Sequence, residues 1–142
     1  MLKDSDLRIV HLLQEDGNLS YAEISRKTGI DESTVRKKIL KLREQGVITR
    51  FSVSVDPDKL GMKSTALVGV DGDPIHLLEI AEKLKALPEV RYLALTSGDH
   101  MIMIEVWCED SARLSHVLMN KIGRIEGVRK VCPSMVLEKI KG

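Results

Sequence analysis

The stretch SYAEISRKTGIDESTVRKKILKLREQ, residues 20–45, holds two helix signals separated by a short turn. Ser20 and Glu23 have the spacing of a capping box, in which each side chain accepts a hydrogen bond from the backbone N–H of the other residue. Gly29 suits the left-handed conformation that ends many helices, and Asp31 is a good N-cap for a following helix. The pattern therefore predicts a helix, a tight turn and a second helix that runs to the end of the stretch.

The second of these helices has an apolar face and a basic face. Apolar residues recur at helical spacing and are expected inside, whereas the outward positions are polar or positively charged: Val35, Ile39 and Leu42 inside, and Ser33, Arg36, Lys37 and Lys41 outside. Residues 21–50 carry eight Lys or Arg against four Asp or Glu, while residues 61–142 carry eleven of each. The net charge of +1 thus conceals a local basic surface, which fits a nucleic-acid footprint or a solvated helix face equally well.

Flanking segments complete a three-helix unit. Residues 4–16 predict an earlier helix with Asp4 as its N-cap, and the β-branched segment from Val47 to Val55 predicts a strand. Three helices with a short turn before a basic helix, followed by a strand, are typical of a winged helix-turn-helix, whose last helix enters the major groove of DNA. A module that oligomerises or binds ligands without binding DNA is the alternative.

The rest of the chain predicts a second domain of βαββαβ order. We expect strands at 65–70, 90–96, 101–108 and 128–140, with one helix opened by Asp73-Pro74 and another capped by Asp110 or Ser111. This order is the ferredoxin-like α+β pattern, with Pro133 on an edge strand. The expected organisation is a winged helix-turn-helix at 1–50, a strand and linker at 51–63, and a ferredoxin-like domain at 64–142.

Several classes of protein are excluded by what the sequence lacks. The longest apolar run is Met101–Ile104, too short to span a bilayer, and the acidic N-terminus does not fit a signal peptide, so we expect a cytoplasmic chain. Cys108 and Cys132 lack CxxC spacing, so we expect reduced core thiols and no metal site. No nucleophile elbow, P-loop or dinucleotide fingerprint occurs, which argues against an enzyme and against a cofactor.

Along its whole length the chain resembles the Lrp/AsnC family, the feast/famine regulators. The resemblance is carried by residues 4–17 (DSDLRIVHLLQEDG), 24–30 (ISRKTGI), 35–42 (VRKKILKL), 46–51 (GVITRF) and 55–61 (VDPDKLG), with the glycine landmarks Ser97-Gly98-Asp99 and Gly127-Val128 in the second domain.

The resemblance implies a transcriptional regulator of amino-acid or general metabolism. Its C-terminal domain would be of the RAM/ACT-like kind, assembling the chain into dimers and then tetramers or octamers, and double-stranded DNA would be bound at a palindromic site. The expected DNA-binding residues are Arg26, Lys27, Ser33, Thr34, Arg36, Lys37, Lys38, Lys41 and Arg50. A small amino acid would bind near Ser97, Gly98, Asp99 and His100.

Some positions depart from the family pattern. Asp31 stands where the family commonly has serine, which preserves the cap, and Lys38 stands where arginine is frequent, which replaces a planar fork with a point charge. Met101 replaces an acidic residue of the effector loop, and Val131 and Pro133 replace threonines. With these polar anchors missing, an amino acid, a more apolar effector and no effector all stay open, and His100 is either an effector contact or a solvated turn residue.

Overall fold

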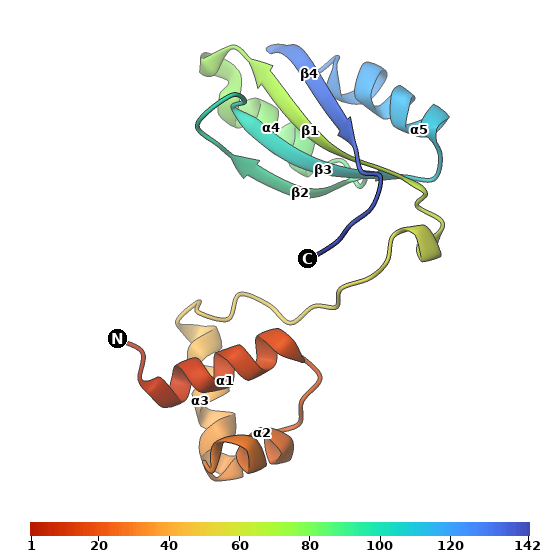
Figure 1. The fold of residues 1–142 in the computed structure, drawn as a ribbon. Helices are drawn as coiled ribbons and strands as arrows, with labels where there is room; N and C mark the ends of the chain where they lie inside the picture. Colours follow the sequence, from red (N-terminus) through yellow and green to blue (C-terminus); the bar gives the residue numbers. More distant parts are fainter. The chain divides into compact units, whose positions relative to one another are not determined.

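The computed structural model describes residues 1–142, which form two compact units, Met1–Val55 and Asp56–Gly142. The first unit holds three helices: α1 (Asp4–Glu15), α2 (Tyr21–Thr28) and α3 (Glu32–Glu44), drawn in red to light orange in Figure 1. The division between the units lies inside the segment expected to be strand and linker. None of the helices is long and apolar enough to cross a membrane.

The three-helix unit closes on a small apolar core. One or two side chains from each helix are fully or almost fully buried, with a ring of partly buried residues around them: Ile9, Ile24, Val35 and Ile39, ringed by Leu12, Leu13, Leu19, Ile30 and Ile48. Leu42 of α3 is also buried, so the inward face predicted for this helix is confirmed. The core is small because the helices have only 8 to 13 residues each.

The start of α1 differs from the prediction. Lys3, not Asp4, is the N-cap residue, and the Asp6 carboxylate accepts a hydrogen bond of 3.0 Å from the Lys3 backbone N–H. Asp4 lies within the first helical turn, where a carboxylate still interacts favourably with the helix dipole.

The strand predicted at Val47–Val55 does not form. After α3 the chain makes a turn and then runs to Asp56 without regular secondary structure. Phe51 and Val53 are exposed, Val53 by 81%. A strand needs a partner to satisfy its backbone groups, and no other segment of this chain pairs with it, so β-branched composition alone was insufficient.

The second unit is an antiparallel four-stranded sheet with two helices. Its elements are β1 (Ser64–Gly72), α4 (Leu77–Lys85), β2 (Val90–Leu95), β3 (Ile102–Cys108), α5 (Ser111–His116) and β4 (Val128–Met135), with short 3-10 turns at Asp58–Leu60 and Pro74–His76 and a π-helical continuation of α5 at Val117–Ile122. The strand order is β2-β3-β1-β4 (Figure 1). The βαββαβ prediction is therefore confirmed, and β4 with Pro133 lies at an edge.

One face of the sheet is covered and the other is open. Alternate residues of β1 and β3, among them Val68 and Ile104, pack against Ile80 of α4 and Leu114 of α5 in one buried cluster. The intervening residues face away from the helices, because side chains alternate across a strand. Leu67 on this open face is 48% exposed.

The last strand is shorter than predicted. β4 ends at Met135, opposite Ala66, and the final bond is from the Val136 N–H to the Thr65 carbonyl at 3.0 Å. In this register Leu137 would lie opposite Ser64, the first residue of β1, so residues 138–140 have no partner on that strand. Residues 136–140 lack regular structure.

Candidate functional site

The turn between α2 and α3 has the geometry that its sequence requires. Ser20 caps α2 by accepting a hydrogen bond from the Glu23 N–H at 3.1 Å. Gly29 then takes φ of 75°, and its N–H donates to the Ser25 carbonyl at 2.8 Å. The Thr28 hydroxyl donates to the Ile24 carbonyl and accepts from the Ile30 N–H. These local bonds set the direction in which α3 leaves α2.

The N-terminus of α3 is organised around the Asp31 carboxylate. The Ser33 and Thr34 hydroxyls donate to it at 2.5 and 2.7 Å, and the Thr34 backbone N–H donates at 3.2 Å. The Ser33 bond, followed by those from Thr34, lowers the pKa of Asp31 to about 2, so this cap is ionised at neutral pH. Both hydroxyl protons are therefore engaged within the protein, and their oxygens are left as acceptors.

A row of cations lies along the exposed face of α3. Arg36, Lys37 and Lys41 are exposed, and none of them forms an ion pair. A hollow of about 600 Å³ lies beside the first two, lined by Tyr21, Glu32, Ser33, Arg36, Lys37 and Leu40. Unpaired cations beside an exposed helix N-terminus provide donors and positive potential for an anionic polymer.

Lys38 differs from its neighbours. Its ammonium lies 3.1 Å from Oδ1 of Asp6 on α1 and is only 22% exposed. The pKa of Asp6 is lowered, first by the Lys3 backbone N–H and then by the Lys38 ammonium. Lys38 therefore ties α3 to α1, and a DNA contact from it would have to compete with this pair.

The remaining predicted cations are exposed at the ends of the unit. Arg26 and Lys27 occupy the last turn of α2, and Arg50 lies in the irregular segment after α3. The neighbouring Arg43 guanidinium stacks over the Phe51 ring with its carbon 5.4 Å from the ring centroid. Arg26, Lys27 and Arg50 have no carboxylate partner within 4.0 Å.

The predicted effector loop joins β2 to β3. Ser97, Gly98 and Asp99 are exposed, and Gly98 has φ of 127°. The Thr96 hydroxyl donates to the His100 carbonyl at 2.6 Å and closes the loop. The loop backbone is thus ordered by its own hydrogen bonds, and its polar side chains are free for a ligand.

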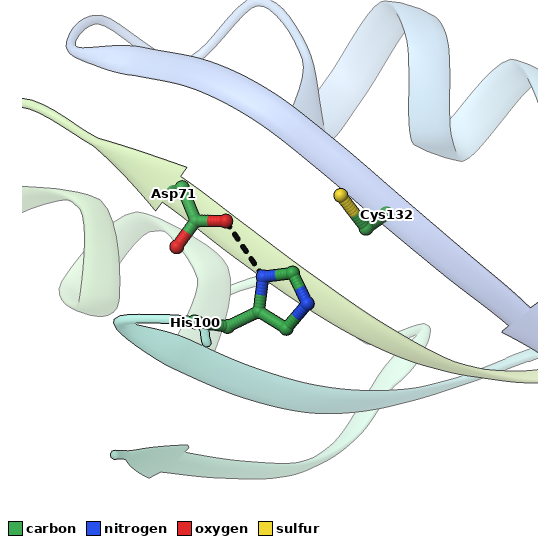
Figure 2. A group of neighbouring side chains, drawn as sticks. All are labelled: Asp71, His100 and Cys132. Atoms are coloured by element: carbon green, nitrogen blue, oxygen red, sulfur yellow. Dashed lines mark hydrogen bonds and ion pairs between the residues drawn. The ribbon is translucent and has the colours of Figure 1, made fainter. Parts of the chain in front are cut away.

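The His100 side chain leaves this loop and lies on the open face of the sheet. Its Nδ1 is 2.6 Å from Oδ2 of Asp71 (Figure 2). The Oδ1 of Asp71 accepts a hydrogen bond from the Met101 N–H at 2.9 Å. The hydrogen bond from His100 is the main cause that lowers the pKa of Asp71. His100 is therefore held by Asp71 and is not a freely solvated residue.

Four residues of these two areas were not predicted as site residues. Tyr21, Glu32 and Leu40 line the hollow on α3, and Asp71 holds His100. In the sequence, the only feature that could have marked Tyr21 as a site residue is its position directly after the Ser20 cap. Asp71 ends β1 and gives no signal in the sequence, because its partner is 29 residues away.

Both units match known protein families. Residues 2–49 match a family described as winged helix-turn-helix DNA-binding, and residues 65–142 match the Lrp/AsnC ligand binding domain. Among curated relatives, the HTH-type transcriptional regulator LrpA of Pyrococcus horikoshii is 44% identical over 141 residues, covering 99% of this chain and all of the relative. LrpA1 of Halobacterium salinarum is 37% identical and covers 98% of each chain.

Solved structures agree with this match. AsnC of Escherichia coli is 26% identical with a TM-score of 0.88, covering all of this chain and 96% of that one. A transcriptional regulator from Neisseria meningitidis, solved as a complex with L-Met, shares the fold with a TM-score of 0.92 at 22% identity, covering all of this chain and 94% of that one.

Proposed function

The chain belongs to the Lrp/AsnC family of transcriptional regulators, and from this premise we propose how it contacts DNA. It is a DNA-binding regulator, not an enzyme. In our proposal α3 enters the major groove, with Arg36, Lys37 and Lys41 in contact with phosphates or base edges. The observation that carries this proposal is that these three cations are exposed on one helix face without a carboxylate partner.

The other predicted contacts take more specific roles in this proposal. Ser33 and Thr34 act as acceptors, for example from a base amino group, because their protons are donated to Asp31. Arg26, Lys27 and Arg50 contact the phosphate backbone. Lys38 contributes less than its neighbours, since its ammonium is paired with the Asp6 carboxylate, which offsets its charge.

We further propose that the chain acts as a symmetric assembly in the cytoplasm. Two copies related by a two-fold axis would place two α3 helices about 34 Å apart, which requires a palindromic site. Dimers would associate through the C-terminal unit into tetramers or octamers. The experiment is selection of bound duplexes from random-sequence DNA, where enrichment of a palindrome supports the proposal and weak, sequence-independent binding contradicts it.

Replacing Arg36 or Lys37 with alanine should weaken DNA binding. If each side chain contacts a phosphate, the slope of log affinity against log salt should fall by about one per variant, and a lost base contact should lower the affinity roughly tenfold. The measurement is fluorescence anisotropy of a labelled selected duplex at several salt concentrations. Lys83→Ala, an exposed lysine on α4, is the matched control. Unchanged affinity and slope in both variants would remove α3 from the interface.

We also propose that the regulator controls amino-acid or general metabolism. A small amino acid would modulate it by binding at the β2–β3 loop. Ser97 and Asp99 offer exposed polar groups, and the Asp99 carboxylate fits an α-ammonium. A neighbour of the same fold was solved as a complex with L-Met, which supports an amino acid as the ligand class. By stabilising one assembly over another, the ligand would change the spacing of the α3 pairs.

Asp99→Ala should abolish the response to amino acids without changing DNA binding in their absence. The variant removes one exposed carboxylate, whereas a side chain at Gly98 would also strain the loop. Oligomer mass by light scattering and DNA affinity are measured with L-methionine and then with a mixture of the twenty amino acids. Glu109→Ala is the control and should respond to amino acids as the unaltered chain does. In Asp99→Ala, we expect the amino-acid-dependent change in DNA affinity to be at least tenfold smaller. A full response in this variant would place the site elsewhere, and no response of the unaltered chain would refute the effector proposal.

A further inference from the structure

Three side chains with different metal-binding atoms meet on the open face of the sheet. They are Asp71 at the end of β1, His100 just before β3, and Cys132 on β4 (Figure 2). One ligand atom from each lies within 4.8 Å of the other two, and all three residues are half-buried. The cluster uses none of the residues of the α3 surface.

The sheet register brings the three residues together. Cys132 lies directly opposite Gly69 on the neighbouring strand, and Asp71 follows Gly69 by two residues, so all three positions share one face. The His100 ring packs on Gly69, where an added Cβ would lie only 2.4 Å from the ring Cγ. The missing side chain of Gly69 thus provides the space in which the imidazole lies over β1.

The position of Asp71 is held by the backbone. Its Oδ1 accepts the Met101 N–H at 2.9 Å, while its Oδ2 lies 2.6 Å from His100 Nδ1. One proton joins the carboxylate to the imidazole in this arrangement. A cation could take the place of that proton, which would leave for the other ring nitrogen or for solvent, and bind both groups. The Cys132 thiol would release its proton to solvent and become the third ligand as a thiolate.

The set of donors selects a class of metal. Carboxylate oxygen, imidazole nitrogen and thiolate sulfur are the three ligand types that Zn²⁺ takes, at about 2.0–2.2 Å for O and N and about 2.3 Å for S. Tetrahedral geometry then places ligand atoms roughly 3.3–3.8 Å apart. The present ligand atoms lie within 4.8 Å of one another, which is close to these spacings.

We propose that Asp71, His100 and Cys132 form a binding site for Zn²⁺ or a similar borderline divalent cation such as Co²⁺. The protein supplies three ligands, and the fourth position is open to water or an exchangeable ligand. Because the ligands come from three separate segments, the bound cation would cross-link β1, the β2–β3 loop and β4. This site is independent of the DNA contacts proposed above.

The test uses Co²⁺, whose thiolate complexes absorb in the near ultraviolet. The full-length chain is kept reduced with a phosphine, titrated with Co²⁺ and then back-titrated with Zn²⁺. We expect one Co²⁺ per chain, a sulfur-to-cobalt band, and loss of that band on addition of Zn²⁺. Zn²⁺ should also raise the unfolding temperature reported by the fluorescence of Trp107, which lies on β3 of the same unit.

Two variants separate this site from other binding. Cys132→Ser should remove the sulfur-to-cobalt band, and Gly69→Ala, which keeps all three ligands but displaces the His100 ring, should weaken Co²⁺ binding at least tenfold. Cys108→Ala is the control, because the Cys108 thiol is buried on the opposite face of the sheet. This variant should keep the sulfur-to-cobalt band. Folding of each variant is checked by circular dichroism. If one of them does not fold, Asp71→Asn is tested in its place. No band in the unaltered chain, or a band that survives Cys132→Ser, overturns the proposal.

Discussion

Replacing Ile24 with alanine is expected to unfold the three-helix unit and abolish DNA binding. Ile24 is fully buried in a core that has only three other buried members. Loss of a buried isoleucine side chain costs about 2–5 kcal/mol. A unit of this size has roughly 3–8 kcal/mol of stability in total, at about 0.05–0.15 kcal/mol per residue. The substitution therefore removes most of what holds α2 against α1 and α3.

The second unit should remain folded in the Ile24→Ala chain, because it has its own core. Trp107, the only tryptophan, lies on β3 and reports selectively on that unit. We expect loss of amide-exchange protection in α1–α3, with an unchanged urea transition of Trp107 fluorescence. Leu7→Ala, at a leucine that is 39% exposed on α1, is the control and should change the free energy of unfolding by less than about 0.5 kcal/mol. Full DNA affinity in Ile24→Ala would contradict the assignment of the core.

Replacing Leu114 with alanine should destabilise the C-terminal unit instead. Leu114 is fully buried between α5 and the sheet, and we expect a loss of about 2–5 kcal/mol in the free energy of unfolding. This core has thirteen buried members, so the unit should be weakened without being unfolded at room temperature. In our proposal the same unit assembles the regulator, so oligomers should dissociate at lower urea concentrations than in the unaltered chain.

The urea transition of Trp107 fluorescence measures this effect directly. Met119→Ala is the matched control, because Met119 lies on the π-helical turn after α5 and is 70% exposed. Amide-exchange protection of α1–α3 should be the same in both variants. A Leu114→Ala chain with an unshifted Trp107 transition would show that α5 contributes little to this core.

Local signals in the sequence predicted most of the fold. The Ser20 cap, the left-handed Gly29 and the Asp31 cap involve neighbours within four residues, so short-range chemistry was sufficient to place α2 and α3. Helical periodicity identified the buried face of α3, and the βαββαβ order followed from the alternation of patterns along the chain. The exposed cations of α3 were predictable in the same way, since they lie opposite that buried face.

Pairing between distant segments was decided only by the tertiary structure. Val47–Val55 has strand composition but no partner, and the predicted end of β4, residues 138–140, lies beyond the first residue of β1. Lys38 belongs to the predicted DNA-binding cations by sequence, but Asp6, 32 residues away, holds its ammonium.

The Asp71, His100 and Cys132 cluster is the clearest case of this kind. Its members lie in three separate segments without any ligand spacing, and only the register of β1 with β4 and the absence of a Cβ at Gly69 bring them together. The sequence by itself thus determined the elements, their order and the basic helix face, because these depend on caps and periodicity. Tertiary structure decided which strands form and which side chains meet, because those outcomes depend on partners that sequence spacing does not specify.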